Sequence, residues 1–428
     1  MTDVYLGIDL GTSGCRALAI DAAGTVRGVA SVPMPAPIRS GERSEQLPEH
    51  WWTALDEVLR ALLAEVPAAS VRAVAVDGTA ATVLLTDATG TALTPALLYD
   101  DTRARAEARR IAAVAPPESP AAQPGSSLAK LLWLSRRPGA DRARHALHVA
   151  DWVTGRLLGR FGVSDVNHCL KMGYDPETGC WPAWLDALNV RRDRLPRVFA
   201  PGTTRGPVSG AIAAAFGLAP DTRVVTGTTD STAAFLATGA RRPGEAVTSL
   251  GSTLVLKVIA PAPLAAARFG VYSQPLGGLW LAGGASNSGG AVLRRFFRRD
   301  ELDALTARLN PERETGLGYY PLLAPGERFP IADPDLAPRL TPRPADDARF
   351  FQGLLEGIAR IEARGYRLLA ELGAPYPVSV RTVGGGARNA PWRRIRERLL
   401  GVPVPASEHE DAAYGAALLA RRGGGGRP

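Results

Sequence analysis

A short segment near the N-terminus carries the residue types that bind phosphate. Asp9 lies at the end of an apolar run, and the turn Gly11-Thr12-Ser13-Gly14 follows it before a second apolar run begins. Glycines have no Cβ, so such a turn lets backbone N–H groups and two hydroxyls come close to a phosphate, and Asp9 could face a cation bound there. The segment predicts a nucleotide phosphate site without the GxxxxGK[ST] loop, which the sequence lacks. A hairpin with no ligand is the alternative interpretation.

The same combination of strand, glycine, two hydroxyls and strand recurs in the second half of the chain. Gly251-Ser252-Thr253 lies between two apolar runs within residues 246–259. Repetition on this scale indicates the duplication of a domain rather than a stack of short repeats. Two such hairpins facing each other would hold the phosphates of one nucleotide from both sides.

Asp230 follows a small-residue turn and opens an alanine-rich stretch that we expect to be helical. Aspartate is a favoured helix N-cap, which is the simplest interpretation of this position. Beside two phosphate-binding hairpins, its carboxylate could instead accept the proton of a hydroxyl that attacks a γ-phosphorus. The residues themselves leave both interpretations open.

A third glycine-rich segment, VGGGARNAPW, covers residues 383–392. Gly385 and Gly386 would let an adenine or ribose lie against bare backbone. Asn389 offers amide hydrogen bonds, and Trp392 offers a flat ring. A strand-to-helix turn with a core tryptophan explains the segment equally well.

Composition narrows the classes of protein to which the chain can belong. Its 428 residues are 46% apolar, which is enough for two domains with substantial cores. No apolar run reaches the ~18–20 residues that span a bilayer. The net charge of +8 comes almost wholly from arginines spread along the chain, because there are only three lysines. We therefore expect a solvated basic surface rather than a nucleic-acid-binding face.

Cysteine and histidine usage predicts neither disulfides nor a metal centre. The three cysteines have neither the number nor the spacing of a disulfide framework or a zinc site. Together with the lack of a secretory signal pattern, this predicts a cytoplasmic protein. His145 and His148 lie three residues apart on a segment that we expect to be helical, and without further ligands we expect no metal there.

Strand-like segments alternate with helical stretches, which predicts an α/β fold. The expected helices cover residues 51–66 and 127–136, and the expected strands cover 71–77, 82–87 and 223–227. A shift in composition at residues 240–245 marks a domain boundary. We therefore expect domains at residues 1–240 and 241–420, followed by a disordered low-complexity tail at 421–428.

Taken in order, the motifs resemble those of the FGGY carbohydrate kinases, which belong to the actin-like ATPase superfamily. The strings GIDLGTSG, DGTAATVLLTDATG, LLYDDTRA, SLGST, GGASNSGGA and GGGARNAPWRRIRERLLGVPV, with the Asp230 segment among them, follow the order of that family over residues 4–420. Five other strings are similar to the compact D-ribulose kinases of cyanobacteria and plant plastids, namely SSLAKL, LKMGYDPE, AVTSLGSTLVLK, GVYS and GERFPIADPD.

The resemblance implies a fold, a reaction and partners. The implied fold is α/β, with two actin-like ATPase (ribonuclease H-like) domains flanking an interdomain cleft. The implied reaction uses ATP and Mg²⁺ to phosphorylate the terminal hydroxyl of a ketopentose. D-ribulose is the expected substrate, and D-xylulose, L-ribulose or another polyol are the alternatives. A non-catalytic, ATP-responsive sugar sensor is the alternative of a different class. We expect a monomer or homodimer that binds sugar and ATP, and neither nucleic acid nor membrane.

The resemblance also implies roles for single residues. Asp9 would organise Mg²⁺ and the sugar, and Asp230 would be the catalytic base. The implied sugar-binding residues are Asp9, Ser13, Gly14, Arg16 and Asp230, and the implied nucleotide-binding residues are Gly11, Thr12, Ser252, Gly385, Gly386, Asn389 and Trp392.

Two positions depart from the family pattern. The family string DGTS reads DGTA here, so Ala80 stands where a serine would reach the sugar. Tyr99 replaces the tryptophan of a WxDxR segment that includes Asp101 and Arg103. The loss of one hydrogen bond to a substrate hydroxyl is worth ~0.5–1.5 kcal/mol, so Ala80 leaves the choice of sugar open.

Overall fold

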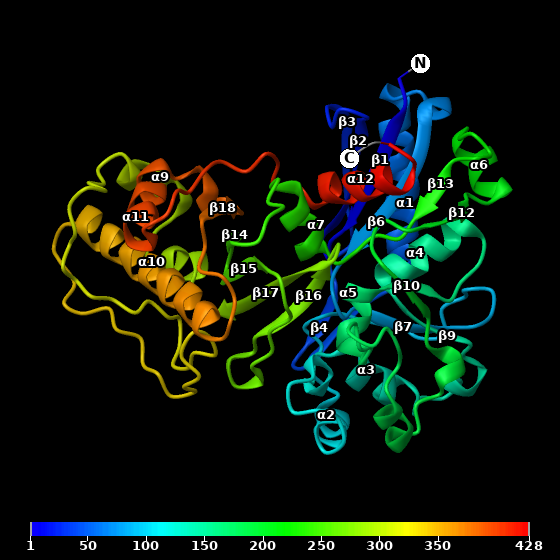
Figure 1. Cartoon of the computed structure of the whole chain (residues 1–428), viewed down its shortest axis with the longest axis horizontal. Coiled ribbons are helices and arrows are strands. Elements are labelled where there is room, and N and C mark those ends of the chain that lie inside the picture. Colours follow the sequence, from blue (N-terminus) through cyan, green and yellow to red (C-terminus); the bar gives the residue numbers. More distant parts are fainter. Residues whose placement is uncertain (1, 427–428) are drawn as a thin grey trace. The chain divides into compact units, whose positions relative to one another are not determined.

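The structure, a computed structural model, describes residues 2–426 and places them in two compact units (Figure 1). The first unit contains the chain up to Ala237 and also the segment from Asp411 onward, and the second unit contains Thr238–Glu410. The composition shift at residues 240–245 thus lies next to a unit boundary. The expected division into 1–240 and 241–420 differs from this one mainly at its second boundary, because the chain returns to the first unit at Asp411.

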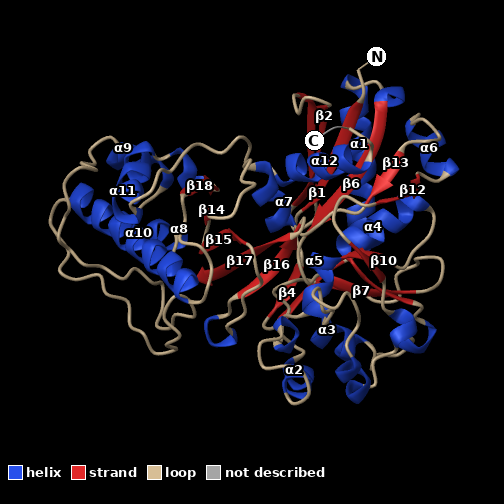
Figure 2. Ribbon diagram, in the orientation of Figure 1, coloured by secondary structure: helices blue, strands red, loops and turns tan. Residues whose placement is uncertain are grey.

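The centre of the first unit is a six-stranded sheet with the order β12-β13-β6-β1-β2-β3 (Figure 2). Its strands are β1 (Val4–Leu10), β2 (Gly14–Asp21), β3 (Val26–Pro33), β6 (Val71–Gly78), β12 (Thr204–Pro207) and β13 (Arg223–Val225). The antiparallel β1–β2 hairpin confirms the prediction from the glycine-rich turn, and β6 runs parallel to β1. The strands predicted at 71–77 and 223–227 are confirmed as β6 and β13.

Helices from distant parts of the chain cover the two faces of this sheet. Leu6 and Ile8 of β1 pack in one apolar cluster with α1 (Pro48–Glu65), whereas Tyr5 packs in another with α12 (Ala412–Gly423). Successive side chains of a strand point to opposite faces, so a strand covered on both sides is apolar almost throughout. For this reason Asp9 is the only acidic or basic side chain in β1 apart from the phenol of Tyr5, and it lies near the end of the strand.

Helix α12 approaches its neighbours too closely for a side chain at two glycines. A Cβ added to Gly7 of β1 would lie 1.9 Å from the carbonyl oxygen of Ala413. A Cβ added to Gly415 would lie 1.9 Å from the carbonyl oxygen of Ala233, which belongs to α7 (Asp230–Ala237). Gly415 therefore sets the distance between α12 and α7.

Gly415→Ala is expected to lower the free energy of unfolding by about 1–3 kcal/mol, because the added methyl group forces α12 and α7 apart. Urea unfolding measures the change. Gly210→Ala is the control, since nothing lies within 4 Å of a Cβ added to this first residue of α6 (Gly210–Phe216). It should leave stability unchanged or slightly raised. A Gly415→Ala protein as stable as the wild type would contradict the close packing described here.

The rest of the first unit is a second sheet surrounded by short helices. The sheet order is β4-β5-β8-β7-β9, and the strands are β4 (Ile38–Ser40), β5 (Arg43–Gln46), β7 (Val83–Thr86), β8 (Ala96–Leu97) and β9 (His145–His148). The remaining elements are the strand pair β10 (Val163–Asp165) and β11 (Arg197–Phe199) and the helices α2 (Arg105–Ala112), α3 (Ser127–Leu134), α4 (Val149–Leu158) and α5 (Val166–Cys169). The predicted strand at 82–87 and helices at 51–66 and 127–136 are confirmed as β7, α1 and α3.

The second unit repeats the central arrangement of the first. Its sheet has the order β16-β17-β15-β14-β18, with β14 (Glu245–Leu250), β15 (Leu254–Ala260), β16 (Tyr272–Leu276), β17 (Leu279–Ser286) and β18 (Ser379–Val383). β14 and β15 form the predicted hairpin, and β18 runs parallel to β14 as β6 does to β1. The helices are α8 (Gly290–Phe296), α9 (Arg299–Thr306), α10 (Asp347–Glu371) and α11 (Ala390–Leu400).

The segment 421–428, expected to be disordered, begins inside a helix. Residues 421–423 form the last turn of α12, and residues 427 and 428 lie outside the described part of the chain. Ala413, Ala417 and Ala420 of α12 are fully buried. Packing against the sheet, rather than composition, therefore decides where this helix ends. Among the described residues, no helix combines the length and apolar character needed to cross a membrane.

Candidate functional site

Two aspartates lie side by side on the parallel strands β1 and β6. Asp9 and Asp77 are register partners on adjacent parallel strands, so their side chains stand next to each other. Asp77 is fully buried, and neither of its oxygens has a hydrogen-bond partner among the residues that the structure describes. A buried carboxylate without a donor or a cation is costly. The pair therefore favours a bound proton or a nearby cation.

The surroundings of this pair disfavour negative charge. Burial raises the pKa of Asp77 well above its ordinary range, and the neighbouring charge of Asp9 raises it further. Burial also raises the pKa of Asp9, to about 6, although the neighbouring Asp77 side chain opposes this shift. Asp230 and Asp411 raise both pKa values. Four carboxyl groups thus gather near the ends of β1 and β6, and such a gathering attracts a cation.

The backbone that leads to Asp230 is pressed against β6. Thr229 pairs with Gly78 in an isolated parallel bridge, and Asp230 then begins α7. A Cβ added to Gly227 would lie 1.7 Å from the carbonyl oxygen of Val76, so the chain can pass there only as glycine. The segment that carries Asp230 therefore runs beside the end of β6, next to the Asp9–Asp77 pair.

Asp230 occupies the first helical position of α7 rather than the position before it. The carbonyl oxygen of Thr229 accepts the N–H groups of Thr232 and Ala233, as that of an N-cap residue does. Oδ1 of Asp230 lies 2.6 Å from the backbone nitrogen of Ser231, which donates to it. A carboxylate in the first turn is favourable for the helix, so the local structure alone would accommodate Asp230. Helix capping does not explain why Asp230 lies beside the carboxyl groups of Asp9 and Asp77.

Asp411 is a member of this group that sequence reasoning missed. It caps α12 by accepting the N–H of Ala413 at 3.0 Å, and its carboxylate lies 3.2 Å from Nη1 of Arg16. The only signal in the sequence is an aspartate before an alanine-rich helix, which is an ordinary N-cap pattern. The return of the chain to the first unit is what brings it to β1.

The turn between β1 and β2 is short, and its tip is exposed. The N–H of Gly11 donates to the carbonyl oxygen of Gly14 at 3.1 Å and closes the turn. Ser13 is exposed and Thr12 is partly exposed. A Cβ on Gly14 would lie 2.8 Å from the carbonyl oxygen of Val32, so strand packing requires this glycine. A Cβ on Gly11 would meet only ordinary contacts, so packing within the protein does not require that one.

The matching turn of the second unit packs on the start of α8. The N–H groups of Gly290 and Ala291 donate to the carbonyl oxygens of Gly251 and Ser252, at 2.9 and 3.1 Å. The side chain of Ser252 is exposed, and its Oγ accepts a hydrogen bond from Nη2 of Arg294 at 2.8 Å. A hydroxyl and a guanidinium thus stand together at this turn, a combination that suits a phosphate oxygen.

The segment 383–392 corrects one expected nucleotide contact. Trp392 is 3% exposed, and its Nε1 donates to the carbonyl oxygen of Leu355 at 3.1 Å, so its ring lies in the core instead of offering a free face. Asn389 caps α11 by accepting the N–H of Trp392 at 2.9 Å. A Cβ on Gly386 would lie 2.6 Å from the Trp392 ring, whereas a Cβ on Gly385 would meet open space. The strand-to-helix turn with a core tryptophan is therefore the arrangement found.

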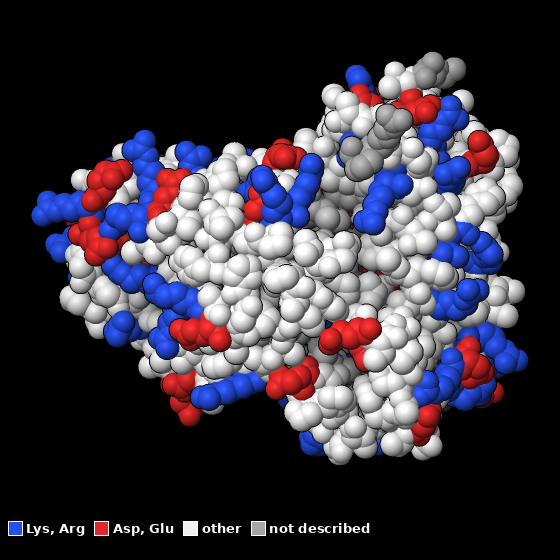
Figure 3. Space-filling view, in the orientation of Figure 1, with Lys and Arg blue, Asp and Glu red and all other residues white. Residues whose placement is uncertain are grey.

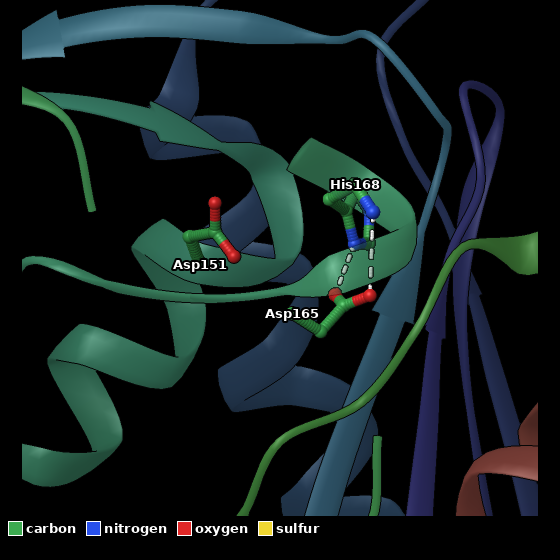
Figure 4. A group of neighbouring side chains, drawn as sticks. All are labelled: Asp151, Asp165 and His168. Carbon is green, nitrogen blue, oxygen red and sulfur yellow. Dashed lines mark hydrogen bonds and ion pairs between the residues drawn. The ribbon is translucent and has the colours of Figure 1, made fainter. Parts of the chain in front are cut away.

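The helix expected around residues 145–148 was wrong, because His145 and His148 lie on β9. His148 instead belongs to a buried cluster, where its Nδ1 lies 2.8 Å from Asp151. Beside it, Nδ1 of His168 lies 2.5 Å from Asp165 (Figure 4). The side chains of Asp151, Asp165 and His168 are close enough together to hold a metal ion.

The protonation of His168 argues for a structural role of that cluster. Burial alone would lower the pKa of His168, but the ion pair with Asp165 overcomes it and raises the pKa to about 9. A metal ion could bind this nitrogen only by displacing its proton and breaking the ion pair with Asp165. The same Asp165 also accepts the N–H groups of Asn167 and His168 and so caps α5. We therefore assign these ion pairs to the packing of α4, β10 and α5.

Buried ion pairs also hold the segment that resembles WxDxR. Asp101 is fully buried, and Nη2 of Arg103 lies 2.7 Å from its Oδ2 and 2.5 Å from Oε1 of Glu45. Tyr99, by contrast, is 50% exposed. Burial and then the charges of nearby carboxylates, Asp230 among them, raise the pKa of Tyr99. The segment thus anchors itself through Asp101 and presents Tyr99 near Asp230.

Comparison with known proteins decides the family. The profile for the N-terminal domain of the FGGY family of carbohydrate kinases matches residues 4–237, and that for the C-terminal domain matches residues 246–423. The chain belongs to the FGGY family of carbohydrate kinases. Membership confirms the expected fold, a two-domain α/β fold of the actin-like ATPase type.

Individual FGGY proteins are similar over nearly the full chain. A xylulose kinase from Streptomyces coelicolor is 31% identical over 445 residues, which cover 97% of this chain and 87% of that protein. The crystal structure of a xyloylose kinase from Brucella ovis is 28% identical, with a TM-score of 0.89 and coverage of 99% and 91%. Plasmodium falciparum glycerol kinase with ADP has a TM-score of 0.86 at 17% identity over 98% of this chain and 89% of that one, a likeness of fold alone.

The cluster of carboxyl groups around Asp9 and Asp77 suits a hard divalent cation such as Mg²⁺. Carboxylate oxygens are the ligands that Mg²⁺ prefers in proteins, together with phosphate oxygens and water. The two oxygens of Asp77 lack donors among the described residues, and Asp9 is the partly exposed member of the pair. Asp9 is therefore the residue able to offer an oxygen outward while Asp77 supports it from within.

The surface charge of this FGGY kinase is mixed on the face drawn in Figure 3. Lys and Arg stand among Asp and Glu on each unit rather than forming one continuous patch on that face. This distribution is in keeping with a solvated basic surface. The expectation that the charge does not serve nucleic-acid binding stays a prediction.

Proposed function

We propose that this FGGY kinase transfers the γ-phosphoryl group of ATP to the terminal hydroxyl of a ketopentose, giving a ketopentose 5-phosphate and ADP. One observation carries the proposal: Thr229 pairs with Gly78, directly after Asp77, so Asp230 lies beside the Asp9–Asp77 pair, and its charge raises the pKa of both. A hydroxyl that attacks phosphorus must lose a proton, and the triphosphate charge must be neutralised. A base and a cation site are thus needed together.

Asp230 is the proposed general base. As the bond from O5 of the sugar to the γ-phosphorus forms, the hydroxyl proton passes to the carboxylate of Asp230. The bond from the γ-phosphorus to the bridging oxygen breaks, and its electron pair leaves with ADP. The N-terminus of α7 stabilises the ionised carboxylate, which is the form that a base requires.

Asp9 is the proposed holder of Mg²⁺, directly or through water, and it also orients the sugar. When bound, Mg²⁺ neutralises charge on phosphate oxygens. Burial and the charge of Asp9 raise the pKa of Asp77, which favours its neutral form and limits the repulsion between the two carboxyl groups. Ser13 and Arg16 are proposed sugar contacts through their exposed side chains. Gly14 is proposed to contact the sugar through its backbone, because strand packing explains its lack of a side chain.

Candidate nucleotide contacts are proposed in each unit separately. In the first unit, Gly11 lets a phosphate approach the backbone, because it has no side chain, and Thr12 offers its hydroxyl. In the second unit, Ser252 and Arg294 offer a hydroxyl and a guanidinium. Gly385 leaves open space where a nucleoside could lie. Gly386, Asn389 and Trp392 support that turn from the protein side, with Asn389 as a helix cap and Trp392 as core.

D-ribulose is the proposed ketopentose, and D-xylulose is the second candidate because the Streptomyces coelicolor protein named above is a xylulose kinase and the Brucella ovis structure is called a xyloylose kinase. The two sugars differ only in the configuration at C3. The site must therefore discriminate them through the contact made to O3. Similarity to the compact D-ribulose kinases in five strings supports D-ribulose, and the smaller side chain at Ala80 removes one possible hydroxyl contact.

Ala80→Ser is expected to change the ratio of kcat/KM for D-ribulose to that for D-xylulose about 2- to 10-fold, because one hydrogen bond is gained or lost. Ala80 is partly exposed in the turn after β6, so a hydroxyl there can reach a ligand. Steady-state kinetics on both sugars give the ratio. Equal changes for both sugars would show that position 80 does not contact the sugar at the distinguishing carbon.

A coupled ADP-release assay tests the function. D-ribulose, D-xylulose, L-ribulose, ribitol and glycerol are each supplied with ATP and Mg²⁺, and kcat/KM values are compared. We expect ADP release that depends on sugar, is highest with a ketopentose, and is lost with a chelator and restored by Mg²⁺. Slow ATP hydrolysis that no sugar stimulates would overturn the proposal and favour an ATP-responsive sensor.

A further inference from the structure

Helix α3 carries a buried lysine that forms no ion pair with another described residue. Lys130 is 0% exposed, and no carboxylate among the described residues lies within ion-pair distance of its Nζ. Nζ instead donates to two backbone carbonyl oxygens, those of Ala81 at 2.9 Å and Leu98 at 2.5 Å. Lysine is almost never fully buried unless it is paired, because the ammonium loses its water. A purely structural position would be filled more easily by an apolar side chain.

The electrostatic surroundings confirm the cost of this position. The pKa of Lys130 is lowered to about 7, chiefly by burial and in part by Lys171, while Asp101 and Asp100 oppose the shift. The amine donates hydrogen bonds to both carbonyls in either protonation state. The burial of Lys130 is costly, and what it provides in return is a pair of hydrogen bonds to the carbonyl oxygens of Ala81 and Leu98.

The first of these carbonyls belongs to the turn that follows the aspartate pair. Ala81 lies four residues after Asp77 in the chain and has φ +60°, the left-handed conformation that side chains other than glycine rarely adopt. The hydroxyls of Thr79 and Thr82 lie 2.6 Å apart and close the turn. Lys130 fixes the Ala81 carbonyl, so it helps to hold this turn, which also carries Ala80, in a conformation it would not otherwise prefer.

The second carbonyl belongs to the segment that presents Tyr99. The oxygen of Leu98 accepts both Nζ of Lys130 and the N–H of Asp101, at 3.0 Å for the latter. Asp101 is in turn fixed by Arg103. One ammonium therefore ties the turn that carries Ala80 to the segment that carries Tyr99, and both lie on the side of the unit where Asp230 stands.

Helix α3 is itself firmly placed, so Lys130 acts from a fixed point. Oγ of Ser126 caps the helix by accepting the N–H of Ala129 at 3.1 Å and donates to the carbonyl oxygen of Ala121 at 2.6 Å. Oγ of Ser127 lies 3.0 Å from Nε2 of the buried His148. Because α3 is fixed in the core, the Lys130 side chain that it carries also has a fixed starting point.

We propose that Lys130 is a positioning residue for sugar binding, whose Nζ locks the turn at residues 79–82 and the segment at residues 98–101 in the arrangement that receives the ketopentose. The inference rests on the proposed kinase function. It differs from a role in stability alone, because it concerns two segments on the sugar side and leaves the nucleotide-binding turns of either unit untouched.

Lys130→Met tests the proposal, since methionine keeps the length of the chain and removes the donors. We expect the KM for the ketopentose to rise about tenfold or more, while the KM for ATP and the rate of sugar-independent ATP hydrolysis stay within about twofold of the wild type. Leu134→Ala is the matched control. It removes a buried side chain from the same helix, so it should lower the Tm without changing the KM for the sugar.

Ala81→Gly in the Lys130→Met background provides a second test. Glycine adopts φ +60° freely, so the turn should keep its conformation without the clamp. We expect the double variant to have a lower KM for the sugar than Lys130→Met alone, because the two positions act on the same turn. A double variant whose sugar KM is as high as that of Lys130→Met, or equal rises of the sugar and ATP KM values in Lys130→Met, would overturn the proposal.

The wild-type protein in the same assay separates the two hypotheses. If it shows no sugar-stimulated ADP release, the proposed kinase function is wrong and the role of Lys130 falls with it. If the wild type is active and Lys130→Met changes only the Tm, the kinase function stands and the positioning role alone is refuted.

Discussion

Asp230→Asn is expected to lower the turnover number about 10²–10⁴-fold while the protein stays folded, because an amide cannot accept the proton of the attacking hydroxyl. The amide oxygen can still accept the N–H of Ser231, so the start of α7 should persist. Steady-state kinetics measure the loss, and thermal unfolding shows that the fold is kept. The KM for ATP should change little, since the proposed role concerns the transferred proton.

The control for this variant is an aspartate at the same helical position with no place in the site. Asp347 is the first residue of α10, and its exposed carboxylate pairs with Arg343 at 3.0 Å. Asp347→Asn should leave turnover unchanged. If Asp230→Asn behaves like Asp347→Asn, with a small loss of stability and normal turnover, then Asp230 serves only the helix start and is not the base.

Asp9→Asn is expected to lower the turnover number about 10²–10³-fold and to raise the Mg²⁺ concentration needed for half of full activity. The substitution removes the partly exposed carboxylate of the pair, whereas Asp77 is fully buried and cannot replace it. Titration of activity with Mg²⁺ at saturating sugar and ATP gives both quantities. Strand β1 should keep its place in the sheet, because asparagine has nearly the same shape as aspartate.

A second aspartate of the same sheet serves as the comparison for Asp9. Asp21 ends β2, is 4% exposed and lies 2.5 Å from Nη2 of Arg27. Asp21→Asn should lower stability, since Arg27 loses its partner, without changing the dependence on Mg²⁺. An Asp9→Asn enzyme whose Mg²⁺ dependence matches that of the wild type would remove Asp9 from the proposed metal role.

Much of the central architecture could be predicted because local signals and the fold agree. The turn Gly11-Thr12-Ser13-Gly14 and its counterpart at Gly251-Ser252-Thr253 lie between runs of apolar residues, and both became antiparallel hairpins. Glycine turns of this kind fix the pairing of the two strands that they join. The start of a helix at Asp230 could also be predicted locally, because an aspartate stands there before an alanine-rich stretch.

Features that depend on distant pairings could not be predicted. Asp77 became a partner of Asp9 through the register of two parallel strands, and no local pattern states which residues such strands place opposite each other. Asp411 joined the group through the return of the chain to the first unit. The buried lysine at position 130 looked like an ordinary helix residue, because its two carbonyl partners lie in other segments.

For Trp392 and His148, the residue type alone did not predict the environment or the secondary structure that the fold gives them. The aromatic ring of Trp392 was an equally good candidate for a ligand surface and for the core, and burial against Leu355 decided for the core. His148 lies on a strand of only four residues, too short to display the alternation that distinguishes a strand from a helix. In both cases tertiary packing supplied the information.

The packing of α12 on β1 also has a consequence for how the chain is made. The face of the central sheet that includes Tyr5, Leu18 and Ala73 is covered by a helix that begins only at Ala412 (Figure 1). At about 5–20 residues per second, the ribosome needs roughly 10–35 s to synthesise the intervening unit. Throughout that interval the nascent sheet presents an apolar face to its surroundings, so a chaperone has a long window in which to bind it.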